Sequence, residues 1–177
     1  PQARLVAMAH LTQLHPELLG RIAGFLEPNE VACSLRLVDR ATAGGLSAHT
    51  TVRLDRPVPP HAFAWRWATP GATRNLNYRQ RRWLLRLTAG TGCLVNLQTA
   101  DAASGLKSED DRDLASCCCA VDAAASAGHL HLCRWLLVDR GLRNATGPAL
   151  VSAAAEGRLE LVRWLLHGDE GWAGMVD

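Results

Sequence analysis

Three groups of residues in this 177-residue sequence have types and spacings that could support chemistry. The first is a run of consecutive cysteines, Cys117 to Cys119. A zinc site needs cysteines about two to four residues apart so that their thiolates converge, whereas consecutive residues of a helix point about 100° apart. We therefore predict that the three cysteines pack as small apolar helix residues, as free cysteines commonly do.

Histidines and carboxylates form the second group. His129 and His131 could be half of a metal site, but no second pair lies at ligand spacing. The stretch SEDDRD, residues 108–113, places carboxylates at a helix start, where the helix dipole favours them, and lacks the alternating spacing of a calcium loop. A phosphate-binding loop, a catalytic triad motif and H-E-x-x-H are also missing. We expect no metal, no cofactor and no enzymatic activity.

The third group combines arginine with tryptophan. RQRRWLLR at 79–86 and WRW at 65–67 could bind RNA through charge and base stacking. The alternative is a helix with buried leucines and solvated arginines. Lys107 is the only lysine among 19 basic residues, and 17 acidic residues almost balance them, so the net charge is only +2. Nucleic-acid binding is therefore the third of our functional hypotheses.

Composition limits the class of protein. An apolar content of 48% is typical of one folded core or a short repeat array. No apolar run approaches the ~20 residues that span a bilayer, so no membrane partner is expected. The six cysteines come without a secretory signal layout, which favours reduced thiols in the cytoplasm or the nucleus.

Helices should position these groups. In residues 11–48, Pro16 can open a helix, the EPNE sequence interrupts it, and ATAGG ends a second helix. These two helices form a predicted αα-hairpin. Large apolar residues recur every three or four positions on one predicted buried face of the first helix: Leu18, Leu19, Ile22, Phe25 and Leu26. Residues 49–77 contain three prolines in four positions and are predicted to be an extended connector.

A duplicated stretch dominates the C-terminal part. AAASAGHLHLCRWLL at 123–137 and SAAAEGRLELVRWLL at 152–166 are identical at nine of fifteen positions. Each copy predicts an alanine-lined helix, a glycine turn and a second helix with an apolar stripe, which only stacking against another copy can bury. The predicted core positions are Ala124, Ala125, Gly128, Leu132, Trp135, Leu136, Ala153, Ala154, Gly157, Leu161, Trp164 and Leu165.

The duplicated pattern resembles the helix–turn–helix of ankyrin repeats, in which a histidine such as His129 often stabilises the turn. The opening T-P-L-H motif of that family is absent, and the copies lie 29 rather than 33 residues apart, which implies a shortened loop. A divergent copy precedes them. The predicted array, residues 78–177, thus has units at 79–100, 109–143 and 146–172. We expect information about function at the six differing positions, such as His131 against Glu160.

Residues 14–40, LHPELLGRIAGFLEPNEVACSLRLVDR, resemble an F-box, although Asp39 stands for its cysteine and Thr42 for its tryptophan. The combination is similar to ankyrin proteins of green algae that begin with an F-box-like segment. The resemblance implies that the hairpin binds a Skp1-type adaptor of a ubiquitin ligase while the repeats hold the substrate protein. The implied adaptor face is Leu14, Pro16, Leu18, Leu19, Ile22 and Val31. The implied repeat surface is Asp122, Ser126, Arg140, Arg143, Asn144, Val151 and Glu156.

Sequence therefore predicts an all-α, short ankyrin-type helical solenoid preceded by an F-box-like helical hairpin. The first functional hypothesis is a substrate-recruiting subunit of a ubiquitin ligase. The second is a scaffold or accessory subunit of a larger assembly, in which the hairpin only caps the array. In both hypotheses the partner is a protein.

Overall fold

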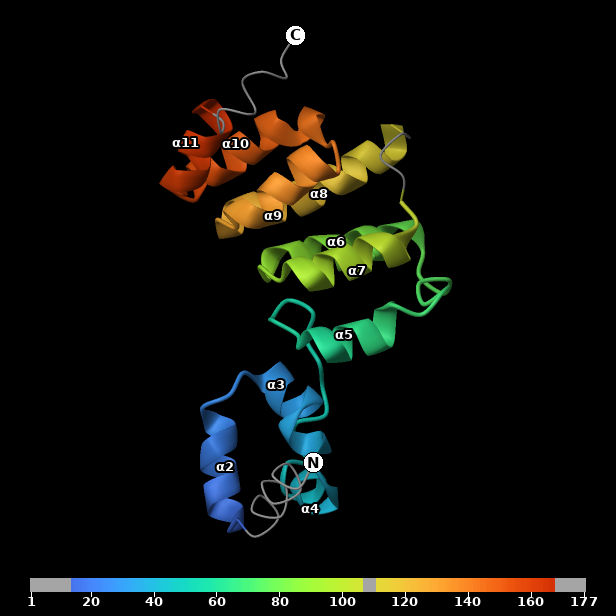
Figure 1. The fold of residues 1–177 in the computed structure, drawn as a ribbon, viewed down its shortest axis with the longest axis vertical. Coiled ribbons are helices and arrows are strands. Elements are labelled where there is room, and N and C mark those ends of the chain that lie inside the picture. Colours follow the sequence, from blue (N-terminus) through green and yellow to red (C-terminus); the bar gives the residue numbers. More distant parts are fainter. Residues whose placement is uncertain (1–13, 107–110, 168–177) are drawn as a thin grey trace, which may run out of the picture. The chain divides into compact units, whose positions relative to one another are not determined.

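The computed structural model describes residues 14–106 and 111–167, and for residues 111–118 it describes the backbone but not the side chains. Within these ranges every regular element is a helix, so the all-α prediction is confirmed. The chain divides into two compact units: unit 1 ends at Ala62, and unit 2 begins at Phe63 (Figure 1). No helix in the described ranges is long and apolar enough to cross a bilayer.

Unit 1 contains more helices than the predicted hairpin. Its elements are α2 (Pro16–Gly24), α3 (Pro28–Cys33), a 3₁₀ turn (Leu35–Leu37) and α4 (Arg40–Gly45). The predicted second helix is interrupted at Ser34, whose φ of −127° and ψ of −68° are not helical. It restarts after Asp39, because the Asp39 carboxylate accepts the Thr42 N–H at 2.8 Å and the Thr42 hydroxyl accepts the Asp39 N–H at 3.1 Å. This reciprocal capping box opens α4.

The core of unit 1 is small and lies between α2, α3 and the end of α4. Leu19, Ala23, Val31 and Leu46 form it, with Leu26 and Leu35 partly buried against it. Only one side of α2 contributes, since Leu19 and Ala23 are four residues apart on the same helix face.

Asn29 ties the connector to α3. Helix α3 begins at Pro28, and Asn29 lies inside its first turn and is 1% exposed. Its amide nitrogen donates to the carbonyls of Arg53 at 2.7 Å and Pro57 at 2.9 Å, and its amide oxygen accepts the Arg53 N–H at 2.9 Å. The side chain of Asn29 therefore holds the backbone of the connector against α3 through hydrogen bonds.

The segment predicted as an extended connector, residues 49–77, is irregular up to residue 59 and then differs from the prediction. Helix α5 (Pro60–Trp67) lies within it. Pro60 suits a first helical turn, and Phe63 and Trp67, four residues apart, are both buried. In unit 2 the Thr73 hydroxyl donates to the Ala103 carbonyl, which fixes the loop after α5.

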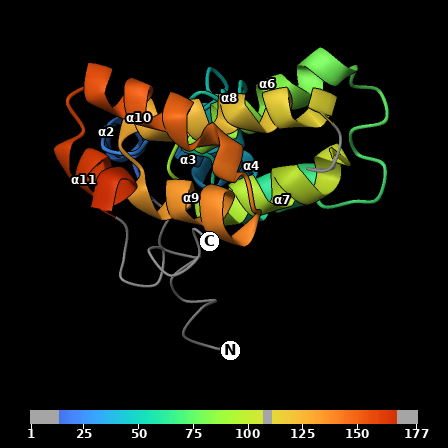
Figure 2. The ribbon, with the colours of Figure 1, turned by 90° about the horizontal axis from the view of Figure 1, so that it is seen from above.

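Unit 2 is a stack of helix pairs. The first pair is α6 (Tyr78–Gly90) with α7 (Leu94–Ser104). The second pair is α8 (Asp111–Ala127) with α9 (Leu130–Arg134), and α9 continues as a π-helix (Trp135–Asp139). The third pair is α10 (Thr146–Ala155) with α11 (Leu159–His167), and a 3₁₀ turn (Arg143–Ala145) precedes α10. The first helices pack on one another, α6 on α8 and α8 on α10. They form one layer, and the second helices form the other (Figure 2).

Each turn between paired helices contains a glycine in the left-handed region: Gly92 with φ 81°, Gly128 with φ 83° and Gly157 with φ 67°. At two of them a Cβ would also have to displace a side chain of the next pair. A Cβ on Gly92 would lie 2.8 Å from Cε1 of His129, and a Cβ on Gly128 would lie 2.9 Å from Cδ of Arg158. The turn glycines therefore leave room for a side chain of the next pair.

Those side chains make a repeated turn-to-turn hydrogen bond. His129 Nε2 bonds the Gly90 carbonyl at 3.0 Å, and Arg158 Nε bonds the Ser126 carbonyl at 2.9 Å. In both cases the donor is the residue directly after the turn glycine of its own helix pair. The acceptor is the residue two positions before the turn glycine of the preceding helix pair. His131 adds a bond of 2.9 Å from Nε2 to the Gly92 carbonyl. Both histidines therefore contact backbone carbonyls of the preceding pair.

Most of the predicted core residues are buried. The buried ones are Ala124, Ala125, Leu132, Leu136, Ala153, Leu161 and Leu165, while Trp135 and Trp164 are half-buried. The turn residues Gly128 and Gly157 are accessible. Ala154 corrects the prediction, because it is exposed where its equivalent Ala125 is 0% exposed. Helix α10 packs on α8 of the second pair, and no helix of the described residues packs on α10 in the same way from the other side.

Candidate binding surfaces

Helix α2 and Phe25, the residue that follows it, carry large apolar side chains on the outer side. Leu18, Ile22 and Phe25 are 46%, 38% and 88% exposed. Their spacing of four and three residues places them on one side of the helix, away from Leu19 and Ala23 in the core. Such a row of large apolar groups that remain open to solvent is the kind of surface that marks an interaction site.

The predicted adaptor face is only partly accessible. Pro16, Leu18 and Ile22 are exposed and Leu14 is half-buried. Leu19 and Val31 correct the prediction, because they are 7% and 0% exposed inside the core of unit 1 and cannot reach a partner while that unit is folded.

Phe25 belongs to this surface and was missed, because the sequence assigned it to the single buried face. The signal was nevertheless present. Apolar residues of α2 form two rows one position apart, and adjacent helix positions differ by about 100°. One row therefore had to lie outside the core.

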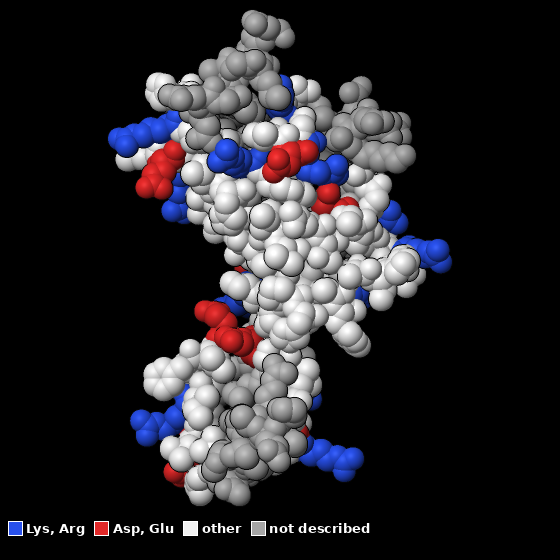
Figure 3. All heavy atoms as spheres, viewed as in Figure 1, with Lys and Arg blue, Asp and Glu red and all other residues white. Residues whose placement is uncertain are grey.

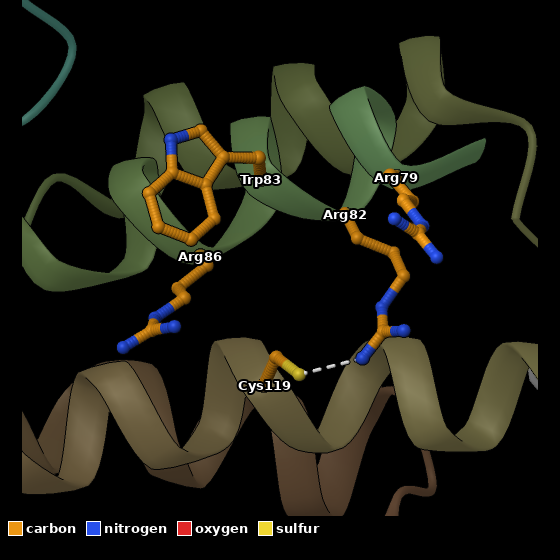
Figure 4. Close-up of a pocket in the computed structure, with 5 residues that line it drawn as sticks. All are labelled: Arg79, Arg82, Trp83, Arg86 and Cys119. Atoms are coloured by element: carbon orange, nitrogen blue, oxygen red, sulfur yellow. Dashed lines mark hydrogen bonds between the residues drawn. The ribbon is translucent and has the colours of Figure 1, made fainter. Parts of the chain in front are cut away.

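A second surface is a groove between α6 and α8 whose described lining includes three arginines. Arg79, Arg82, Trp83 and Arg86 of α6 line it together with Cys119 of α8, and its volume is about 420 Å³ (Figure 4). The four α6 residues share one helix face by their spacing. The opposite face carries Leu84, Leu85 and Ala89, which are buried. The predicted helix with buried leucines and outward arginines is thus present.

Two contacts order the groove. Arg82 Nη2 lies 2.9 Å from the Cys119 sulfur, across the gap between the helices (Figure 4). The guanidinium carbon of Arg86 lies 5.2 Å from the Trp83 ring centroid, a cation–π arrangement. Cys119 therefore accepts a hydrogen bond instead of only packing, while the side chains of Cys117 and Cys118 lie outside the described residues.

Other cysteines are packed. Burial raises the pKa of Cys33, and it raises the pKa of Cys133, which is 0% exposed, to about 12. Both thiols are therefore protonated and unreactive at neutral pH. In the part of the chain that the structure describes, no three His, Cys, Asp or Glu residues gather where they could hold a metal ion.

The predicted repeat surface is accessible in part. Arg143, Asn144, Val151 and Glu156 are exposed, and Asp122 and Ser126 are half-buried. Arg140 corrects the prediction. Its Nε and Nη2 lie 2.8 and 2.9 Å from the two carboxylate oxygens of Asp101 at the end of α7. This paired contact joins the second helix pair to the first, so the guanidinium is used within the chain.

The surface around α7 carries little charge, because Asp101 is the only charged residue of that helix. The corresponding part of unit 2 is largely white in Figure 3, where white marks residues other than Lys, Arg, Asp and Glu. A hollow of about 460 Å³ lies there between α7 and the loop after α5. Its lining is neutral: Trp67, Ala68, Thr69, Pro70, Gly71, Val95, Gln98, Thr99, Ala102 and Ala103.

Neither a family model, nor a curated protein, nor a solved structure matches this chain in comparisons with known proteins. The class that the structure defines is therefore stated from its own features: an all-helical chain in which stacked helix pairs form one unit and short helices around a small core form the other.

Proposed function

We propose that this chain is a protein-interaction module in which the outer face of α2 binds an adaptor of the Skp1 type, so that the chain recruits substrates to a ubiquitin ligase. The observation that carries the proposal is the row of exposed Leu18, Ile22 and Phe25 on a helix whose other side forms the core. The F-box resemblance of residues 14–40 supplies the class of partner.

Apolar burial provides the driving force. Phe25 is 88% exposed, and aromatic side chains bury about 150–250 Å² each when they enter an interface. At roughly 25 cal/mol per Å², Phe25 alone can contribute about 4–6 kcal/mol of gross burial energy before association costs are subtracted. Leu18 and Ile22 precede Phe25 on the same side and enlarge the contact. The exposed repeat residues Arg143, Asn144 and Val151 then remain for a substrate protein.

The test is co-purification of the chain with a Skp1-type adaptor. The triple variant Leu18→Ser/Ile22→Ser/Phe25→Ser should abolish adaptor binding while the circular dichroism spectrum keeps its helical amplitude. Val52→Ser is the matched control, because Val52 is 43% exposed in the same unit but outside α2, and it should bind the adaptor like the wild type. Absence of adaptor binding by the folded wild-type chain would refute the proposal.

A scaffold role is the second candidate, and a different surface favours it. Leu159 and Leu166 on the third helix pair are 67% and 60% exposed, beside the exposed Ala154. The chain would then co-purify at fixed stoichiometry with partners that are not ligase components. Leu166→Ser should weaken that association, and the triple α2 variant should leave it unchanged.

A further inference from the structure

We propose that the hollow between α7 and the loop after α5 binds an uncharged peptide segment of a partner protein through the backbone amide groups of that segment. The observation that carries the proposal is the indole N–H of Trp67, a largely buried donor at the wall of the hollow. The whole lining belongs to unit 2. The inference goes beyond the adaptor face of α2, and it rests on the proposal that the chain is a protein-interaction module.

Trp67 is the last residue of α5 and is only 9% exposed. Its indole N–H donates to no acceptor in the part of the chain that the structure describes, although the N–H of a buried tryptophan usually has a hydrogen-bond partner. The nitrogen is not sealed from solvent, and the side chain lines the hollow. A ligand that places an acceptor oxygen in the hollow can therefore supply the missing hydrogen bond.

Neighbouring side chains hold the indole in place. The guanidinium carbon of Arg66 lies 4.2 Å from the centroid of the Trp67 ring, a cation–π arrangement. The Phe63 ring lies 6.3 Å from Trp67 between centroids, with the two planes tilted by 44°. A donor that is already ordered loses little conformational entropy when a ligand binds.

The loop that forms the other wall is also fixed. The Thr73 hydroxyl donates to the Ala103 carbonyl of α7, and the Ala72 N–H donates to the Thr69 carbonyl at 3.0 Å. These contacts hold the loop against α7, so the hollow exists before a ligand arrives. Its volume of about 460 Å³ lies within the range of roughly 300–1,000 Å³ that is typical of ligand sites.

The remaining polar groups favour an amide. The side chains of Gln98 and Thr69 line the hollow, and neither forms a hydrogen bond with a described residue. A glutamine amide offers a donor and an acceptor, which match the C=O and N–H of peptide units. A carboxylate or a phosphate dianion offers acceptors only. Val95 and Pro70 add apolar contact for small side chains of the peptide.

Nuclear magnetic resonance of the ¹⁵N-labelled full chain tests the inference, with acetyl-Ala-Ala-Ala-amide as an uncharged probe. The indole N–H signal of Trp67, identified by its loss in Trp67→Phe, should move downfield and saturate, because a carbonyl acceptor deshields the proton. Backbone amide signals of Val95 and Gln98 report binding in every variant. Trp67→Phe keeps an aromatic ring and should weaken binding by about fivefold, the usual size of one hydrogen bond. Trp65→Phe is the matched control, because Trp65 lies on the same helix, is 82% exposed and does not line the hollow; it should change the affinity by less than about twofold.

The absence of a saturable shift, or an unchanged affinity in Trp67→Phe, would overturn the inference. N-methylacetamide, which has a single amide, should bind at least about tenfold more weakly than the peptide because it forms fewer hydrogen bonds. Equal binding would assign the hollow to small free amides, and tighter binding of acetate would assign it to anions, so either result would contradict a peptide site. If Trp67→Phe fails to fold, Gln98→Ala at an exposed position of α7 carries the same expectation.

The titration uses the purified chain without an adaptor. Adaptor binding depends on α2 in unit 1, whereas the hollow belongs to unit 2. The triple α2 variant should therefore bind the peptide probe like the wild type, and Trp67→Phe should bind the adaptor like the wild type. Failure of the adaptor proposal and failure of the peptide-site proposal are thus distinguishable.

Discussion

Leu137 and Leu166 occupy the same position of the duplicated stretch and have opposite environments. Leu137 is 0% exposed, and Leu166 is 60% exposed. Replacing each by alanine removes the same atoms from the same residue type in a helical context. The two variants therefore compare a buried and an exposed leucine at equivalent positions of the duplicated stretch, one in the π-helix and one in α11.

The expected costs follow from burial. For Leu137→Ala, loss of transfer energy plus a cavity should lower the free energy of unfolding by about 2–5 kcal/mol. For Leu166→Ala, the side chain already contacts water over more than half of its surface, so the cost should be about 0.5–1 kcal/mol. Urea denaturation followed by circular dichroism at 222 nm resolves this difference, provided that both variants unfold with the wild-type slope.

Two results would refute the reasoning. Equal costs would mean that another part of the protein or a partner covers the third pair. A cost for Leu137→Ala below about 1 kcal/mol would mean that Leu137 is not part of a packed core as described. A change in slope would instead indicate separate unfolding of the stacked pairs, which repeat arrays permit.

Two further predictions concern contacts between the helix pairs. Gly128→Ala should destabilise the chain by about 1–3 kcal/mol, because alanine is disfavoured at positive φ and its Cβ would meet Arg158. The double variant Gly128→Ala/Arg158→Ala should recover the part of this cost that is due to the clash. Urea denaturation measures both changes. Arg140→Ala should cost about 1–3 kcal/mol at pH 7, because it leaves the Asp101 carboxylate buried without its partner. Burial raises the pKa of Asp101 and Arg140 opposes this rise, so the variant should have a still higher folded pKa than the wild type. A group whose folded pKa exceeds its unfolded value favours folding at low pH and loses that contribution as pH rises through the folded pKa. The deficit of the variant relative to wild type should therefore be smaller near pH 4 than at pH 7, and a constant deficit would contradict this.

The sequence predicted the helix pairs and their turns because these depend on local properties. Glycine at the turn and leucine at three- and four-residue spacing act within one copy, and positions such as Gly128 and Leu132 have the conformation and burial that the pattern requires. Ala154 could not be predicted in the same way. Whether Ala154 is buried depends on a further helix that packs against it, and the sequence of one copy does not contain that information.

The differing positions of the two copies were expected to hold functional information. His129 and Arg158 show a structural use instead. They differ in chemistry, yet each bonds a carbonyl of the preceding turn. A carbonyl accepts a hydrogen bond from any correctly placed N–H, so an imidazole and a guanidinium serve equally. Variation between repeats therefore does not by itself mark a binding residue.

In unit 1 the periodicity assigned Leu18, Ile22 and Phe25 to the core, whereas the F-box resemblance placed Leu18 and Ile22 on the adaptor face and omitted Phe25. A helix as short as α2 has one face against a small core, and Leu19 and Ala23 already fill it. Leu18, Ile22 and Phe25 exceed what that core can bury. The excess of apolar residues over available core, rather than their periodicity, is the physical signal for a partner.

The two candidate surfaces differ in the force that would hold a partner. The α2 face is apolar, so association there depends on buried area and changes little with salt. At the groove of α6 and α8, Arg79 and Arg86 are exposed, so a contact made there through their charge weakens as ionic strength rises. The surfaces also belong to separate compact units. A partner held through both would gain avidity from two weak contacts, and raising the salt concentration would remove one contact while leaving the other.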